Sequence, residues 1–236
     1  MCFAQKTTMS NKVKAEQYVL EGVSRKSNND LKGALLSLSL AINLDPYNAD
    51  AFFYRGEIHE IKGSQIDALN DYTKACNLRK DKVALYKKGL LEEKQGKIET
   101  AITDYTEAIK LDSNDVNPYL RRALCYNKTG NTEEALADIN VGLLHNPANL
   151  NALYLRSGLY AELQNFQSAI NDLTRILLID NKRKSVLGLR GYYFFIIEDY
   201  EKAYNDLNEF IIKFPDCEQK YKDMRASSKE KLKRSL

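Results

Sequence analysis

The segment YRGEIHEIKGSQIDALNDYTKA, residues 54–75, carries an Arg-Gly pair inside a helical pattern and an Asp sixteen residues after the Arg. Glycine in a helix interior costs about 1 kcal/mol relative to alanine, and a charge on an apolar stripe needs a partner. Both residues therefore need a structural reason. The rest of the sequence provides that reason, because the pattern is repeated.

The same pattern returns four more times downstream of this segment. A basic residue followed by a small residue recurs at steps of 33, 34, 34 and 34 residues. An Ala follows each small residue after twelve positions, and an Asp follows each Ala after three. Five copies of one unit are thus visible, and a weaker first copy ends in INLDP at residues 42–46. The basic and acidic positions are Arg55 and Asp71, Lys88 and Asp104, Arg122 and Asp138, Arg156 and Asp172, and Arg190 and Asp206.

Each unit contains two apolar-periodic helical runs around a short polar turn, such as KGS at residues 62–64. In an antiparallel helix pair, the middle of the first helix lies opposite the middle of the second. The sequence therefore predicts that each basic residue pairs with the Asp of its own or a neighbouring unit, because an Arg fork suits a carboxylate. In the first copy, Glu21 and Ser37 replace both members together. The small residues predict a close approach of two helices.

Further positions of the unit also recur. In the second copy they are Gly56, Gly63, Ala68, Tyr72 and Ala75, and closing prolines occur at Pro46, Pro147 and Pro215. With these residues the unit resembles the tetratricopeptide repeat (TPR) family over about residues 15–215. The resemblance implies an all-α fold, a right-handed α-solenoid (superhelix) of about six helix-turn-helix repeats with a C-terminal capping helix. The chain departs from the family in having no Trp, and in placing a cation where a Leu is usual.

The repeat boundaries define the expected domain organisation. Residues 1–14 are expected to form a flexible N-terminal segment, and residues 216–236 a basic capping helix and tail. Between them, residues 15–215 form the TPR array. The expected repeats span about residues 15–48, 49–81, 82–115, 116–149, 150–183 and 184–215.

The charge distribution argues against a nucleic-acid partner. The net charge is +3, and residues 1–14 and 216–236 each contribute +3, so the repeats between them sum to −3. Affinity for phosphates rests on clustered Lys and Arg, which such an array lacks. No apolar run approaches the roughly 20 residues needed to cross a bilayer, so the sequence predicts no membrane insertion.

The sequence shows no pattern typical of catalysis. It has two His, no phosphate-binding GxxxxGK[ST] loop and no GxGxxG motif. The four Cys lie far apart without a CxxC pair, which favours reduced thiols in the cytoplasm over a metal site. We therefore expect a cytoplasmic protein, with a cilium as a further location, that has no enzyme activity, cofactor or metal.

The TPR resemblance implies that the first helix of each repeat lines a concave face, which binds an extended peptide or a helix of another protein. Helical periodicity places residues next to each ion-pair cation on that face. Tyr and Arg are common in interface hot spots, and Lys87 and Arg121 are expected to bind a carboxylate of the partner. The candidate groove residues are Phe53, Tyr54, Tyr86, Lys87, Leu120, Arg121, Tyr154 and Tyr192.

These residues suggest three candidate functions. The leading hypothesis is an interaction scaffold or adaptor that holds a peptide or helix of a partner protein in the groove. The alternative is a structural subunit of a large assembly, such as a ciliary or organellar complex. A chaperone cofactor is less favoured, because the positions of the family's carboxylate clamp hold residues such as Val19, Val23 and Val83. The sequence leaves the partner and the oligomeric state open.

Overall fold

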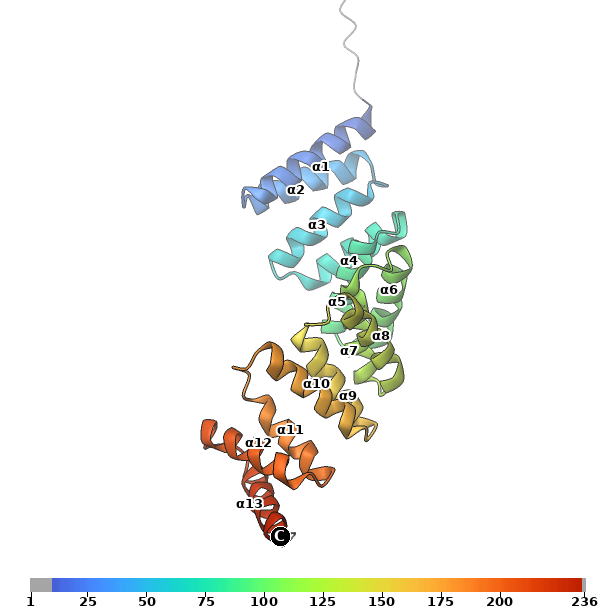
Figure 1. Cartoon of the computed structure of the whole chain (residues 1–236). Coiled ribbons are helices and arrows are strands. Elements are labelled where there is room, and N and C mark those ends of the chain that lie inside the picture. Colours follow the sequence, from blue (N-terminus) through green and yellow to red (C-terminus); the bar gives the residue numbers. More distant parts are fainter. Residues whose placement is uncertain (1–9, 235–236) are drawn as a thin grey trace, which may run out of the picture. The chain divides into compact units, whose positions relative to one another are not determined.

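The computed structural model describes residues 10–234, and in this range the chain forms thirteen α-helices and no strand (Figure 1). In chain order they are α1 (Asn11–Ser27), α2 (Leu31–Leu44), α3 (Ala49–Ile61), α4 (Gln65–Leu78), α5 (Lys82–Lys94), α6 (Ile98–Leu111), α7 (Val116–Lys128), α8 (Thr132–His145), α9 (Leu150–Glu162), α10 (Phe166–Ile179), α11 (Val186–Ile196), α12 (Tyr200–Lys213) and α13 (Gln219–Arg234). The fold is all-α and is a solenoid of helical repeats, as the sequence predicts. No helix among the described residues is long and apolar enough to cross a membrane.

Helices pack first within a repeat and then between repeats. Within a repeat, α1 packs on α2, α3 on α4, α5 on α6, α9 on α10, and α11 on α12. Between repeats, the second helix contacts the next first helix, as α2 contacts α3 and α10 contacts α11. Each of the six predicted repeat ranges contains the bulk of two helices.

The turn inside each repeat needs a left-handed backbone. Gly63 and Gly96 follow the first helices of the second and third repeats with φ values of 77° and 76°. Glycine adopts this conformation without a steric penalty, which explains the recurring turn glycine. The first, fifth and sixth repeats place Asn29, Gln164 and Glu198 at positive φ instead.

The first helix begins earlier than the sequence predicts. A flexible segment was expected up to residue 14, but α1 starts at Asn11. The side chain of Ser10 accepts a hydrogen bond from the backbone N–H of Val13 at 3.4 Å and so caps the helix. Burial of Ala15 and Val19 then holds this part of the helix in place. Residues 1–9, the rest of the predicted segment, lie outside the described residues.

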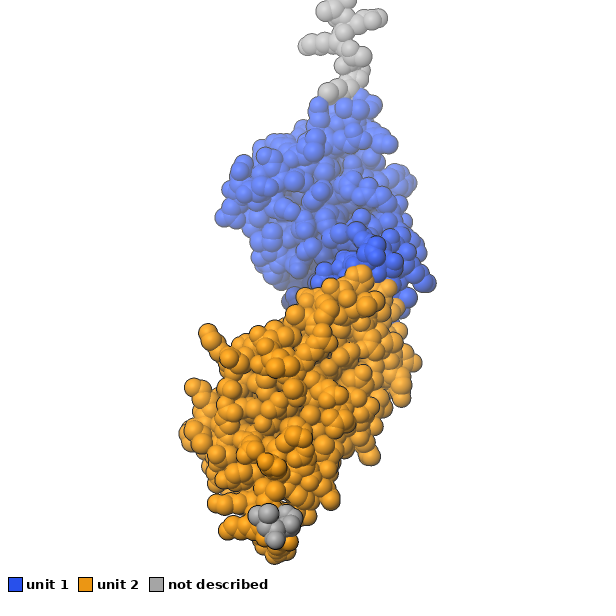
Figure 2. Space-filling model, in the orientation of Figure 1, with its two compact units in different colours: residues 1–118 blue, residues 119–236 orange. Residues whose placement is uncertain are grey.

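The chain divides into two compact units, residues 1–118 and 119–236 (Figure 2). In unit 1 the fully buried large side chains include Leu38, Tyr72 and Tyr105. In unit 2 they include Leu153 and Leu173. Each unit therefore has its own apolar core between first and second helices, as expected for repeats that bury their surface mainly against neighbours.

The small residue after each cation is required by the approach of the second helix. A Cβ atom at Gly56 would lie 2.9 Å from the Tyr72 ring, and one at Gly89 would lie 2.8 Å from the Tyr105 ring. Contacts below 3.0 Å cannot be accommodated without movement of the buried ring. The helix-interior glycine of the opening segment is therefore retained because a tyrosine of the partner helix fills the space beside it.

The last helix, α13, packs against α12 and α11. It lies within the range predicted for the capping helix, residues 216–236. Arg225 on α13 donates a hydrogen bond to Asn208 on α12 at 3.4 Å. In the same way, Arg190 on α11 donates to Thr174 on α10 at 3.1 Å. Helix α13 therefore packs on the sixth repeat as the first helix of a following repeat would.

Candidate protein-interaction surface

All five predicted cation–Asp pairs form within their own repeats. In the fourth repeat, Arg122 Nε and Nη2 donate to the two carboxylate oxygens of Asp138 at 2.8 and 2.7 Å. Arg55 with Asp71, Arg156 with Asp172, and Arg190 with Asp206 show the same bidentate geometry at 2.7–2.8 Å. The Asp side chains are buried, so these pairs join the two helices of a repeat through charge-assisted hydrogen bonds.

The arginines also reach back to the preceding repeat, which the sequence analysis missed. Arg156 Nη1 donates to Asn140 Oδ1 at 2.7 Å, and Arg55 Nη1 approaches Ser39 Oγ at 3.5 Å. These polar residues lie sixteen positions before the Arg, just as the Asp lies sixteen positions after it. The equal spacing of sixteen residues on both sides of the Arg is the sequence pattern that could have predicted this second contact.

An aromatic ring lies one helical turn after most of the arginines. The guanidinium carbon is 5.7 Å from the ring centroid of Tyr126 for Arg122, and 5.7 Å from that of Tyr160 for Arg156. Such a contact adds a cation–π attraction and covers the flat face of the guanidinium. In the second repeat this position holds His59, whose Nε2 lies 3.8 Å from Asp71 Oδ2.

The third repeat has a different charge balance. Lys88 Nζ donates to Asp104 Oδ1 at 2.8 Å and lies 3.6 Å from Glu92 Oε1. Both carboxylates are buried, and Glu92 Oε2 and Asp104 Oδ2 receive no hydrogen bond from the described part of the chain. The pKa of the Asp104 carboxyl is raised to about 7, chiefly by burial and further by the Glu92 carboxyl, against the opposing effect of Lys88. Two buried acids here share one cation.

The predicted groove residues of unit 1 lie on α3 and α5 and are partly exposed. Phe53 and Tyr54 line a hollow of about 290 Å³ together with Val83 of α5. Tyr54 also lines a second hollow of about 320 Å³, with Val19 and the exposed Leu20 of α1. Tyr54 and Asp50 of α3 line both hollows, so the two adjoin, and Ala75 of α4 closes the first of them. Tyr86 is partly exposed, and its ring lies 5.9 Å from that of Tyr105.

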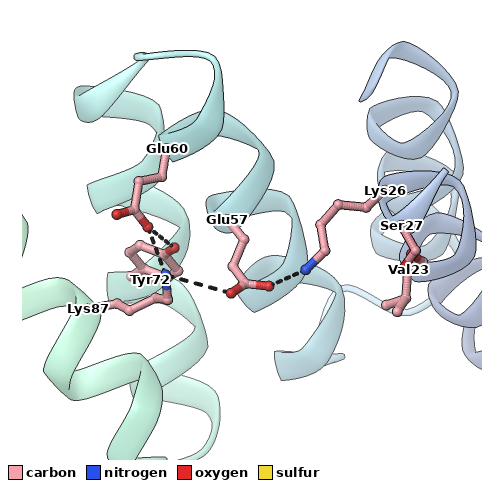
Figure 3. Close-up of polar contacts among 7 residues, drawn as sticks. All are labelled: Val23, Lys26, Ser27, Glu57, Glu60, Tyr72 and Lys87. Atoms are coloured by element: carbon pink, nitrogen blue, oxygen red, sulfur yellow. Dashed lines mark hydrogen bonds and ion pairs between the residues drawn. The ribbon is translucent and has the colours of Figure 1, made fainter. Parts of the chain in front are cut away.

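A network of charges continues this surface across α1, α3 and α5 (Figure 3). Lys26 Nζ lies 2.6 Å from Glu57, while Lys87 Nζ lies 3.6 Å from Glu57 and 3.0 Å from Glu60. Tyr72 donates to Glu60 at 2.8 Å. Burial opposes the charge on Glu60, but the hydrogen bonds from Lys87 and Tyr72 outweigh it and lower the pKa of the carboxyl.

The pairing of Lys87 changes its expected role. The sequence suggests that Lys87 binds a carboxylate of the partner, but in the structure it already contacts Glu57 and Glu60. The two acids lie 30 and 27 residues before the lysine, on the neighbouring first helix. A partner carboxylate would have to displace them, so Lys87 lines the surface as part of an internal ion-pair network.

The predicted groove residues of unit 2 differ in their availability. Leu120 packs into the space left by Gly142 on α8, where a Cβ atom would meet Leu120 at 2.7 Å. Leu120 is partly exposed although it packs against Gly142, so its place in the groove stays a prediction. Tyr154 is 52% exposed and Tyr192 is partly exposed, whereas Arg121 is exposed on α7.

One helical glycine of unit 2 has no packing role. A Cβ atom at Gly158 would meet nothing within 4 Å, unlike at every other helical glycine in residues 10–234. Gly158 lies one turn after the exposed Tyr154, in the same face of α9. Gly158 lowers helix stability without making room for a neighbouring side chain. Its backbone is therefore open to contact with another molecule.

Comparisons with known proteins agree with this architecture. A family model described as a TPR repeat matches residues 89–130. The structure is similar to that of YrrB, described as a TPR protein with an unusual peptide-binding site, with a TM-score of 0.66 and 23% identity over 70% of this chain and 86% of that chain. It is also similar to MamA, with a TM-score of 0.66 and 19% identity over 72% of this chain and 93% of that chain. No curated protein matches the sequence.

A third similar structure covers more of the chain. PilF of Pseudomonas aeruginosa matches with a TM-score of 0.66 and 16% identity, over 93% of this chain and 100% of that chain. These identities establish the fold alone. Together with the family match over residues 89–130 and the five internal copies, the shared fold supports a tetratricopeptide repeat protein.

Proposed function

We propose that this protein is a non-enzymatic interaction scaffold that binds a peptide or helix of a partner protein along its first helices. The observation that carries the proposal is the pair of adjoining hollows in unit 1 that share Tyr54. TPR folds generally serve protein interaction, and the similar protein YrrB is described as having a peptide-binding site. In the described residues, no cluster of three or more His, Cys, Asp or Glu is arranged to hold a metal ion.

The lining of the hollows suggests what kind of segment would bind. Leu20 is 70% exposed and lines one hollow with Tyr54. Val83 is 44% exposed and lines the other hollow with Phe53 and Tyr54. Rigid aromatic rings beside aliphatic side chains favour insertion of apolar side chains from a partner. The adjacent charge network of Lys26, Glu57, Lys87 and Glu60 is internally neutral, so we expect apolar contacts to dominate affinity.

The proposal includes a cytoplasmic location, where cysteine thiols remain reduced. Cys76 and Cys125 are buried as free thiols, and burial raises the pKa of the Cys76 thiol to about 12. Such a thiol stays protonated at neutral pH and is a poor nucleophile for disulfide exchange. These cysteines therefore act as packing residues.

The test is affinity purification of the tagged protein from its native cells with partners identified by mass spectrometry. Tyr54→Ala removes the ring shared by the two hollows, whereas the matched control Tyr47→Ala removes an 81% exposed tyrosine that lines neither hollow. We expect Tyr54→Ala to lose a partner that Tyr47→Ala retains. If both variants keep every partner while remaining folded, the surface in unit 1 is not the binding site.

A second variant examines unit 2. Gly158→Trp places a large side chain where a Cβ atom meets no neighbour, so the fold should tolerate it. Loss of partners in this variant would extend the binding surface to α9. Retention of partners, together with their loss in Tyr54→Ala, would confine the surface to unit 1.

A further inference from the structure

A row of exposed apolar side chains runs along the second helices of unit 2. Leu144, Leu178 and Ile212 lie near the ends of α8, α10 and α12 (Figure 1), and they are 80%, 81% and 74% exposed. They are spaced by 34 residues, so they occupy one position of the repeat. Isolated exposed apolar residues are common on protein surfaces, but a regular row of them marks an interaction site.

The repeats of unit 1 show that the fold does not require apolar residues in this position. The equivalent residues there are Asn43, Asn77 and Lys110. The same helix ends therefore form with polar side chains that suit contact with water. The apolar row in unit 2 needs a reason other than folding.

Two exposed charges of opposite sign lie beside this row. Arg175 precedes Leu178 by three residues on α10, and Glu209 precedes Ile212 by three residues on α12. Residues three apart on a helix are surface neighbours, so each charge lies one turn from its apolar residue. Glu209 is contacted by Lys184 at 2.8 Å, and both of these side chains remain accessible to solvent.

We propose that the row binds a second copy of this chain. A two-fold axis running between α10 and α12, parallel to them, would place Leu178 of one copy against Ile212 of the second copy. The same rotation would place Arg175 of each copy against Glu209 of the other copy, which gives two ion pairs. A two-fold interface must be self-complementary. Arg175 and Glu209 at matched positions meet that condition, with each Glu209 then shared between Lys184 of its own copy and Arg175 of the second copy.

The charges select this arrangement over other occupants of the row. A two-fold axis through α10 would bring Arg175 close to Arg175 of the second copy. An anionic lipid surface would be repelled by Glu209 at the α12 end of the row. The row lies on second helices, whereas the candidate binding hollows lie mainly on first helices, so both contacts can form in one molecule.

The first experiment measures the mass of the full chain by sedimentation equilibrium over a wide range of concentration. We expect the wild type to dimerise and Leu178→Asp to raise the dimer dissociation constant by about 30-fold or more, as for a central hot-spot residue. Because Leu178 is 81% exposed, the variant should still fold. The matched control Asn77→Asp changes the same repeat position in unit 1 and should leave the dissociation constant unchanged. A wild type that remains monomeric at all concentrations would overturn the proposal.

A charge exchange then tests the pairing itself. Arg175→Glu and Glu209→Arg should each weaken the dimer, because each places like charges opposite one another. The double variant should recover wild-type dimerisation, because it restores both pairs with reversed signs. Failure of the double variant to recover would rule out this two-fold arrangement. Since Tyr54→Ala should not affect the dimer, this proposal can fail or succeed independently of the binding function.

Discussion

The third and fourth repeats build the same ion-pair position with different chemistry. In the fourth, the two N–H groups of Arg122 satisfy both oxygens of Asp138, and Tyr126 lies 5.7 Å from the guanidinium. In the third, Lys88 is the cation and Glu92 stands in place of the aromatic ring. One ammonium group then serves two buried carboxylates, and one oxygen of each has no hydrogen bond among the described residues.

The difference indicates that two residues one helical turn apart set the geometry of the pair. A planar guanidinium fits a carboxylate edge-on and an aromatic ring on its face. An ammonium group is compact and cannot fill both carboxylate oxygens with parallel bonds. Lys therefore occurs with Glu in the third repeat, and Arg occurs with an aromatic residue in the fourth, fifth and sixth repeats.

The largest expected effect comes from breaking the complete pair of the fourth repeat. Asp138→Ala would leave Arg122, whose side chain is 15% exposed, without its carboxylate. We expect the free energy of unfolding to fall by about 3 kcal/mol, because removing one member of a buried ion pair leaves the other charge without its bidentate partner in a partly buried position. Urea denaturation followed by circular dichroism measures this loss. A loss below about 0.5 kcal/mol would mean that the pair behaves like an exposed one.

The matched change in the third repeat should cost much less. Asp104→Ala leaves Lys88 with Glu92 as its remaining partner at 3.6 Å and removes one of two neighbouring acids. We expect a loss below about 1 kcal/mol at neutral pH, because the relief of repulsion offsets the lost hydrogen bond. Equal losses for Asp104→Ala and Asp138→Ala would show that the two repeats are energetically alike.

A conversion of the third repeat into the fourth should stabilise the protein. The double substitution Lys88→Arg with Glu92→Tyr introduces the fork and the ring and removes the second buried acid. We expect the free energy of unfolding to rise by about 2 kcal/mol, since buried unpaired polar atoms cost about 1–3 kcal/mol. The reverse change, Arg122→Lys with Tyr126→Glu, is the control and should destabilise by a similar amount. A change of the same sign in both double variants would contradict the comparison.

The pH dependence of stability should also originate in the third repeat. The pKa of Asp104 is raised from its ordinary value of 3.8 to about 7, in a site that also contains Lys88, Glu92 and Cys76. Between these values the folded state holds a proton that the unfolded state has released. The stabilising contribution of the protonated form is therefore complete below about pH 4 and is lost as the pH rises through about 7.

This contribution is measurable by comparing wild type with Asp104→Asn, which cannot titrate at this position. Between pH 5 and pH 7, the wild type should lose about 2 kcal/mol more stability than the variant, an order-of-magnitude value from the linkage relation. Titrating groups outside this site change both proteins equally and cancel. Parallel stability profiles for the two proteins would show that Asp104 is ionised in the folded state across this range.

Much of the fold and of the ion pairs could be predicted, because internal repetition supplied several observations of each position. The pairing of Arg122 with Asp138 follows from a spacing that occurs five times. The groove was less predictable, because it depends on contacts between repeats. Leu120 packs against Gly142, and Lys87 pairs with Glu57, which is 30 residues away. Such contacts depend on local differences between repeats, which periodicity alone does not reveal.

The third and fourth repeats differ both in the cation and in the residue one helical turn after it. The second repeat allows these two factors to be tested separately, and its substitution has the smallest expected effect. It keeps the bidentate pair of Arg55 and Asp71 but has His59 in the position of Glu92. His59→Glu would therefore combine the arginine of the fourth repeat with the acid of the third.

We expect His59→Glu to reduce the free energy of unfolding by only about 0.5 kcal/mol, because Arg55 still satisfies both oxygens of Asp71 and the side chain at position 59 is partly exposed. His59→Gln controls for loss of the imidazole ring without adding charge. If His59→Glu instead costs as much as Asp138→Ala, then the second acid alone weakens the pair. A small loss would assign the weakness of the third repeat to its lysine, which cannot occupy both carboxylate oxygens as the arginine fork does.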